Sequence, residues 1–370
     1  MPIWKGAITA RRFAVSDNPS TWGEGWRDKL RERIEEYAFR RPQRPVPGEE
    51  VWGFVLPDNL LETDFSNTNR WHIDPYVLLG LRCDKTVLPK EKVLAETKSR
   101  ANAWCQERGV ERCPSAVRRA IKEQVEEDLR GEARTKTTVV DVAWNTELGY
   151  VLAGATSTKV SDEIRKRFFR AFGCKLAPTG PLRERDLPAL LGYPEAEAVP
   201  ADLTLQMLSW IHLVSEDQDG RGLEMGDERA ILVTDRVSFI GTKDTSSVQI
   251  KGEQAGCKHE AKTAVADGRL VSDAKVEFLH GAESVGVTIL AGELPDMKSL
   301  KFLGAGDESS DPSADARVER LVLYEGIYDE LVDWAARFAE LRADNVAWQD
   351  HLDRRAEWAG REEPAASEVA

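Results

Sequence analysis

Few side chains of this sequence have the types and spacing that a metal site needs. Ser215–Gly220 contains the D-x-D-G pattern of a calcium loop, but serine stands at position one and Gly226 at position twelve, where such a loop requires a bidentate glutamate. Cys257 and His259 could supply two zinc ligands, yet no second pair lies near them and structural zinc takes four. We therefore interpret Ser215–Gly220 as a turn and expect neither a metal nor a cofactor.

Motifs of the common enzyme classes are also missing. The sequence contains no G-x-x-x-x-G-K-[ST], G-x-G-x-x-G, H-E-x-x-H or G-x-S-x-G segment. The five histidines include no i, i+4 pair, and no carboxylate pair is set apart as a general acid and base. We expect a protein that is not an enzyme.

The most informative side chains are basic. Residues 85–185 contain 21 Lys and Arg against 14 Asp and Glu, whereas the whole chain has a net charge of −13, which leaves −20 on the remainder. Residues 305–370 alone carry 17 acidic and 7 basic side chains. This segregation indicates a cationic surface for a polyanion on an otherwise anionic molecule; the alternative is that these charges only solvate helix faces.

The basic residues fall on two predicted helices and one predicted strand. Apolar residues at 117, 121, 125 and 129 recur every four positions, which predicts a helix with one buried stripe. A strand is expected directly after it, and a second helix is expected to begin with Ser161 as its N-cap. The cations are Arg118, Arg119 and Lys122 on the first helix, Arg130, Arg134 and Lys136 at the junction with the strand, and Arg165, Lys166 and Arg170 on the second helix.

Strands and helices are mixed along the whole chain. Apolar runs predict strands over 3–14, 50–56 and 76–84, and again over 229–241, 246–251, 270–279 and 284–291. Between them, Gly109 and Pro114 are expected to separate two helices. We predict an α+β fold with two mixed sheet and helix units per subunit. The expected segments are an N-terminal α+β unit (1–84), a basic helix and β-hairpin unit (85–200), a second α+β unit (201–304), a C-terminal helix (305–345) and an acidic, disordered tail (346–370).

Composition also indicates the compartment. No run of eighteen apolar residues occurs, and the first residues, MPIWKGAITARRF, lack the pattern of a secretion signal. The five cysteines form no C-x-x-C pair. We expect reduced thiols, no membrane contact and a cytoplasmic location.

The order of segments resembles the RdgC family of bacterial recombination-associated proteins. The resemblance covers about residues 1–345 and lies in the order and spacing of several segments. These are MPIWKGAITARRF, VWGFVLPDNLLETDF, YVLLGLRCDKTVLPKEKV, VRRAIKEQVEEDL, TTVVDVAWNTELGYVLAG, EIRKRFFRAFGCKLAPTGP, LTLQMLSWIHLVSE and MKSLKF.

The resemblance implies a nucleoid-associated protein that binds double-stranded and single-stranded DNA with little sequence preference. It further implies a ring-shaped homodimer with a cationic channel around duplex DNA, no catalysis, and restraint of the recombinase RecA by competition for DNA. Carried to this chain, the channel residues would be the nine cations named above, with Lys251 and Lys258 as weaker candidates near a second subunit contact.

Two features depart from the family pattern. Well-known members have a Leu-Pro-Arg-Ala-Phe segment whose aromatic residue helps to hold the ring, whereas residues 129–134 of this chain read LRGEAR. The acidic C-terminal portion matches nothing in the shorter members. These departures bear on how, and whether, a ring closes.

A second interpretation keeps the acidic charge as the functional feature. The protein could be an acidic scaffold or inhibitor that imitates DNA and binds a recombination protein through its negative surface, without binding DNA itself. The dependence of DNA affinity on salt concentration separates the two interpretations.

Overall fold

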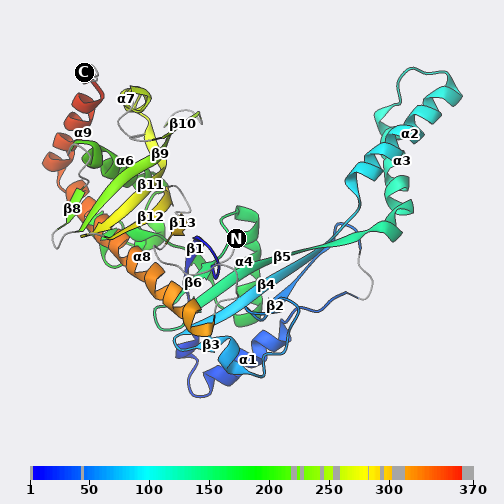
Figure 1. The fold of residues 1–370 in the computed structure, drawn as a ribbon, viewed down its shortest axis with the longest axis horizontal. Helices are drawn as coiled ribbons and strands as arrows, with labels where there is room; N and C mark the ends of the chain where they lie inside the picture. The colour runs from blue at the N-terminus through cyan, green and yellow to red at the C-terminus, as the bar shows by residue number, and fades with distance from the viewer. Residues whose placement is uncertain are drawn as a thin grey trace, which may run out of the picture. The chain divides into compact units, whose positions relative to one another are not determined.

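The computed structural model describes residues 3–42, 46–217, 223–225, 229–241, 246–252, 259–281, 283–291, 296–301 and 313–360. These residues form the α+β fold that the sequence predicts, with a large antiparallel sheet and helices packed on it (Figure 1). The chain divides into two compact units that interleave in sequence. Unit 1 contains residues 1–26, 72–78 and 141–370, and unit 2 contains residues 27–71 and 79–140. The division into five consecutive segments that is expected from the sequence stays a prediction.

Unit 1 is built on antiparallel strands. Their order is β10 (Ser247–Lys251), β9 (Arg229–Ile240), β11 (Leu270–His280), β12 (Glu283–Leu290), β13 (Asp296–Lys301), β1 (Ile8–Val15) and β6 (Tyr150–Ala153), with β7 (Leu176–Pro178) paired to β1 and β8 (Leu223–Met225) paired to β9. In the hairpin of β11 and β12, Val276 lies opposite Val287 and Phe278 opposite Val285. Val276 and Phe278 are fully buried, and the strands predicted over 270–279 and 284–291 are confirmed as β11 and β12 with boundaries that differ by one residue.

Helices of unit 1 cover the sheet. They are α4 (Thr158–Phe172), α5 (Leu187–Leu190), α6 (Ala201–Asp217), α7 (His259–Ala266), α8 (Ala314–Ala343) and α9 (Asn345–Gly360), with 3-10 turns η1 (Pro19–Thr21), η4 (Pro181–Arg183) and η5 (Ala196–Ala198). Helix α6 packs on β9 and β11, and its Trp210 contacts Phe338 of α8. Among the helices of the described ranges, none combines the length and apolar character needed to cross a bilayer.

Helix α9 occupies a part of the chain in which the sequence predicts a disordered tail from residue 346. Trp358 and His351 hold the helix in place, since they are 4% and 2% exposed. The Trp358 ring lies 5.4 Å from the ring of His212 on α6. The disorder prediction rested on the acidic composition of this stretch, which does not show that these two side chains are buried. Their burial against the rest of unit 1 docks the helix. The rest of the predicted tail, residues 361–370, lies outside the described residues.

Two predicted boundaries on unit 1 are wrong by four and five residues, respectively. Helix α4 is capped by Ser157, whose hydroxyl accepts a hydrogen bond from the Val160 amide, and not by Ser161. Ser161 lies inside the helix and is buried. Its hydroxyl accepts a hydrogen bond from the Arg11 guanidinium. Strand β1 starts at Ile8 instead of residue 3, after Gly6, which has φ +63°.

Unit 2 contains a smaller sheet and a helical hairpin. Its strands lie in the order β5 (Arg134–Asn145), β4 (Tyr76–Val87) and β2 (Glu50–Val55), and the unit 1 residues at the start of β4 pair with β3 (His72–Ile73). The helices are α1 (Trp26–Glu36), α2 (Lys90–Arg108) and α3 (Ser115–Asp128), with 3-10 turns η2 (Thr68–Arg70) and η3 (Arg130–Glu132). Helix α2 ends at Gly109, with φ +62°, and Pro114 precedes α3, as predicted.

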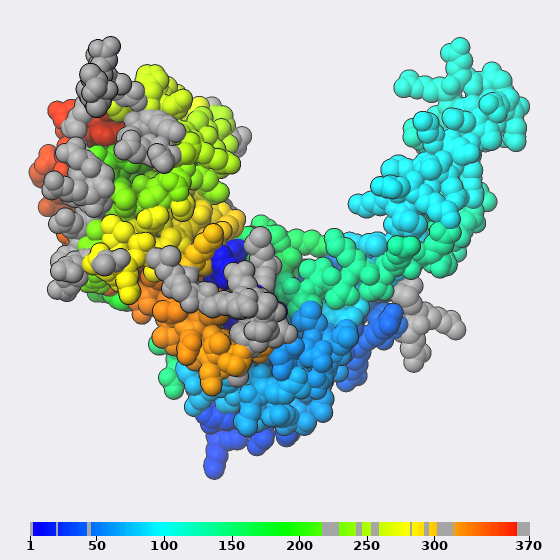
Figure 2. Space-filling view, viewed as in Figure 1, coloured from blue at the N-terminus to red at the C-terminus, as the bar shows by residue number. Residues whose placement is uncertain are grey.

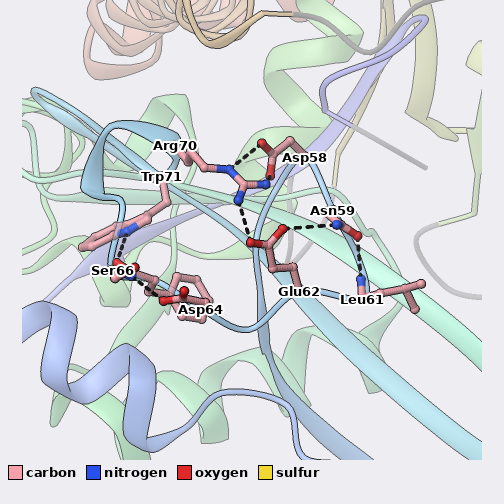
Figure 3. Close-up of polar contacts among 9 residues, drawn as sticks. Asp58, Asn59, Leu61, Glu62, Asp64, Ser66, Arg70 and Trp71 are labelled. Atoms are coloured by element: carbon pink, nitrogen blue, oxygen red, sulfur yellow. Dashed lines mark hydrogen bonds and ion pairs between the residues drawn. The ribbon is translucent and has the colours of Figure 1, made fainter.

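A loop of unit 2 between β2 and β3 is held by Arg70 (Figure 3). The guanidinium of Arg70 donates two hydrogen bonds to Asp58, at 2.9 and 3.0 Å, and one to Glu62 at 2.8 Å. These carboxylates raise the pKa of Arg70. Trp71 donates its indole N–H to the Phe65 carbonyl at 3.0 Å. Arg70 is therefore committed to this loop and is not a candidate for binding an external anion.

Gly53 of β2 allows the backbone of residues 37–39 to approach the sheet. A Cβ at Gly53 would lie 2.3 Å from Phe39 Cα and 2.5 Å from Phe39 N, and both are backbone atoms that cannot turn away. We expect Gly53→Ala to destabilise unit 2 by about 2 kcal/mol or more, measured by urea unfolding followed through hydrogen exchange of the β2 amides. Gly131→Ala, where nothing lies within 4 Å of the added Cβ, should change stability by less than about 0.5 kcal/mol. Equal protection in the two variants would contradict the steric argument.

Candidate nucleic-acid interface

The α2–α3 hairpin of unit 2 is held by a small apolar cluster. Val93 of α2 packs against Val125 and Leu129, with Leu88 and Ile121 at its margin. Across the hairpin, Arg100 forms an ion pair with Asp128 at 2.6 Å, and Lys92 forms one with Glu132. The two helices lie side by side beyond the ends of β4 and β5 (Figure 1). The outer surfaces of α2 and α3 are open to solvent (Figure 2).

The cations of α3 are exposed, but two of the three are paired with carboxylates on their own helix. Arg119 lies 3.2 Å from Glu123, and Lys122 lies 3.3 Å from Glu126. Arg118 forms no ion pair with any residue that the structure describes. Exposed i, i+4 pairs contribute about 0.3–0.5 kcal/mol, so a phosphate could displace these carboxylates. The pairs nevertheless reduce the positive field of α3.

The start of β5 presents two cations on one face. Arg134 and Lys136 are two residues apart on a strand, so their side chains project to the same side. Residues 134–138 are all exposed, and neither cation has an ion-pair partner within the described ranges. Arg130, in the turn before this strand, is paired with Glu127 at 2.6 Å. Arg134 and Lys136, named here the β5 pair, are therefore the better placed of the predicted residues.

A cleft in the same unit adds two lysines that the sequence analysis missed. It has a volume of about 450 Å³ and lies where β4 leads into α2, with Lys85, Lys90 and Lys122 among its lining residues. Lys85 forms an ion pair with Glu50 at 2.7 Å, whereas Lys90 is exposed and has no such partner in the described part of the chain. The sequence offered a signal for these lysines. The apolar run ends at Leu88-Pro89, which indicates a strand-to-helix junction with Lys85 before it and Lys90 after it.

The second group of predicted cations belongs to unit 1. Arg165, Lys166 and Arg170 lie on α4; Arg165 is 3.6 Å from Asp162, and Lys166 is 3.0 Å from Glu163. Arg170 is exposed without an ion pair to a described residue. Each unit thus carries its own group of predicted cations.

The two weakest candidates are not joined to either group. Lys251 is exposed at the end of β10 in unit 1. Lys258 lies outside the described residues.

The charges divide unevenly between the units. Unit 2 contains 22 basic and 19 acidic side chains, whereas unit 1 contains 29 basic and 45 acidic ones. Unit 2 is therefore the cationic part of an anionic chain. A weakly positive surface with several uncompensated Lys and Arg side chains is suited to bind phosphates without reading bases.

The fold and this surface define a mixed α+β protein with one cationic unit. In comparison with known proteins, the chain is 26% identical over 317 residues to the recombination-associated protein RdgC of Cupriavidus pinatubonensis. The aligned region covers 80% of this chain and 95% of that protein. No family model matches the sequence. The chain is thus distantly similar to that RdgC protein over four fifths of its own length.

Proposed function

We propose that this protein is a recombination-associated protein that binds double-stranded and single-stranded DNA without sequence preference through unit 2. The observation that carries the proposal is the β5 pair, two exposed cations on one strand face without carboxylate partners in the described residues. The similarity to RdgC over 95% of that protein supports a role in recombination. The protein acts by binding, and no catalytic step is part of the proposal.

Cations at fixed positions are sufficient for this activity. Each phosphate that Lys or Arg neutralises releases condensed counterions from DNA, whatever the base sequence. The acidic charge of unit 1 opposes approach over long range, but charges more than about 8–10 Å away are largely screened at physiological salt. DNA on the unit 2 surface would respond mainly to the local cations. The primary phosphate contacts of this proposal are the exposed cations without an ion pair to any described residue: Arg134, Lys136, Arg118 and Lys90.

A homodimer that encircles duplex DNA extends the proposal. Symmetry would present each of these cations twice, and a closed ring would slow escape from circular DNA without adding any contact. Competition for DNA would then restrain RecA. DNA binding itself would place the protein at the nucleoid. The residues 129–134 lack the aromatic residue of well-known RdgC proteins, and Leu129 is buried in the α2–α3 cluster. Ring closure would need other contacts here.

The test is the dependence of DNA affinity on salt. The four cations without an ion pair to a described residue, doubled in a dimer, give about eight phosphate contacts, so log K should fall against log salt with a slope of about −7. Fluorescence anisotropy with duplexes of unrelated sequence, from about 50 to about 200 mM salt, should show this slope and equal affinities. Absence of binding at the lowest salt would contradict the proposal and favour the acidic scaffold that acts without DNA.

A further inference from the structure

A second polar cavity lies in unit 1 and is lined by residues of that unit alone. Its volume is about 270 Å³, and it is lined by residues of α6, the start of β11, the end of α8 and helix α9. The polar and aromatic side chains that line it are Gln206, Ser209, Arg342, Trp348, His351 and Arg355. Three of these six carry a basic group, and no carboxylate is among the described residues that line the cavity.

Neither arginine of the cavity has a carboxylate partner among the described residues. One guanidinium nitrogen of Arg355 donates a hydrogen bond to the Arg269 carbonyl, and Arg342 Nε donates one to Gln206 at 3.4 Å while its guanidinium stacks on Trp348 at 4.9 Å. Neither forms an ion pair with a carboxylate in the described ranges, and burial lowers the pKa of Arg355. Partly buried charges in proteins are normally compensated, so two guanidiniums that lack a carboxylate partner within the described ranges favour the binding of an anion in this cavity.

His351 provides independent evidence. The side chain is 2% exposed and lines the cavity, and its ring packs on the ring of Trp348, with 5.0 Å between the two centroids. Burial and the nearby Arg355 and Arg354 lower its pKa to about 4. The ring is therefore neutral at physiological pH and has one N–H group to donate. Because the imidazole lines the cavity, an anion bound there would be able to accept a hydrogen bond from this N–H group.

We propose that this cavity binds the phosphate group of a small molecule. The guanidiniums of Arg342 and Arg355 would neutralise the phosphate through charge-assisted hydrogen bonds, and the neutral ring of His351 would donate a further one. The remaining volume, beside Leu270 and Leu352, has room for a larger organic portion than inorganic phosphate possesses. This inference does not rest on DNA binding, because it concerns other residues in the other unit.

Free phosphate compounds and nucleic-acid phosphates share this chemistry, so the experiment has one arm for each. Calorimetric titration of the full-length protein with inorganic phosphate and with adenosine monophosphate, at constant ionic strength, should show saturable binding. Arg355→Gln and Arg342→Gln should each weaken it about tenfold or more. Arg354→Gln is the matched control, since Arg354 is an exposed neighbour outside the cavity lining, and it should change affinity less than about twofold.

Two further measurements separate this site from a structural effect and from DNA binding. In NMR titrations, the His351 resonance, assigned with His351→Gln, should show a pKa above about 4 once phosphate is added, because a bound anion favours the protonated ring. Arg355→Lys keeps the positive charge but lacks the planar guanidinium with its paired donors. This variant should bind phosphate more weakly than the wild type and more strongly than Arg355→Gln. DNA affinity should be the same in wild type and Arg355→Gln.

Absence of phosphate binding by the wild type, or an unchanged His351 pKa, would overturn the proposal. Equal affinity of Arg354→Gln and Arg355→Gln would do the same. A large loss of DNA affinity in Arg355→Gln, without binding of the free compounds, would assign the cavity to the nucleic-acid surface instead of a small molecule. Failure of the salt test above would leave this result unaffected.

Discussion

Replacing the β5 pair by glutamates, as Arg134→Glu/Lys136→Glu, should lower DNA affinity at least about 100-fold. Each cation of a phosphate contact contributes about 1.5–3 kcal/mol when the hydrogen bond is charge-assisted, and two lost contacts amount to about 3 kcal/mol or more. Both side chains are exposed at the start of β5, so the substitution removes no packing. The salt slope should become less steep by about 1 for each lost contact. Anisotropy titrations over a range of salt measure both quantities.

The matched control makes the same change of charge elsewhere in unit 2. Lys29 and Arg33 lie four residues apart on α1, both exposed, with Arg33 paired to Glu36 at 2.9 Å. Lys29→Glu/Arg33→Glu should weaken DNA binding less than about threefold at physiological salt, where distant charges are screened. An equal loss in both double variants would show that net charge, not the β5 surface, determines affinity. Full binding by the β5 variant would remove these residues from the interface.

The ion pairs on α3 make a graded comparison possible. Arg118 has no carboxylate partner in the described residues, whereas Arg119 is paired with Glu123. DNA must displace a carboxylate from Arg119 but not from Arg118, so Arg118→Gln should reduce affinity more than Arg119→Gln. The triple variant Arg118→Glu/Arg119→Glu/Lys122→Glu is expected to lose the most.

Local periodicity was sufficient to predict much of unit 2. The apolar residues at 121, 125 and 129 recur every four positions. In the structure, Val125 and Leu129 are buried in the α2–α3 cluster, with Ile121 at its margin. Gly109 and Pro114 mark the break between the helices for backbone reasons that act within a few residues. The location of the predicted cations on α3, β5 and α4 followed from the same patterns.

What the sequence did not indicate depends on contacts between distant residues. The role of Ser161 changed from cap to buried acceptor because Arg11, 150 residues earlier, donates to it. The charge of Lys85 is paired with that of Glu50 on the neighbouring strand. Trp358 of α9 contacts His212 on α6. Composition could not show these pairs, because they arise from tertiary packing.

Arg11→Met should destabilise unit 1 by about 3–5 kcal/mol, a large part of the stability of an ordinary domain. Arg11 and Asp296 are each 4% exposed and lie opposite one another on β1 and β13. The guanidinium donates to both carboxylate oxygens at 2.6 Å, to the Ser161 hydroxyl at 2.7 Å and to the Thr156 carbonyl at 2.6 Å. Methionine fills similar volume, so the cost arises from leaving the Asp296 carboxylate buried without its partner.

The pH dependence gives this prediction its sign. Burial raises the pKa of Asp296 even though Arg11 acts in the opposite direction, so removal of Arg11 should raise that pKa further. A carboxyl whose pKa is higher in the folded than in the unfolded state holds more protons when folded, and its stabilising effect is lost as pH rises through the folded value. The deficit of Arg11→Met should therefore be largest near neutral pH and shrink on acidification. Urea unfolding of wild type and Arg11→Met at acid and at neutral pH measures this loss of stability.

The double variant Arg11→Met/Asp296→Leu is the control, because it replaces both charges by apolar groups. It should recover a large part of the lost stability, since two apolar side chains at this site avoid the desolvation of an unpaired carboxylate. Its unfolding free energy should also lose the pH dependence of the single variant, as no titrating group remains at the position. A deficit of Arg11→Met below about 1 kcal/mol, or one that is equal at acid and neutral pH, would show that the contact between β1 and β13 is held by backbone pairing and not by this buried ion pair.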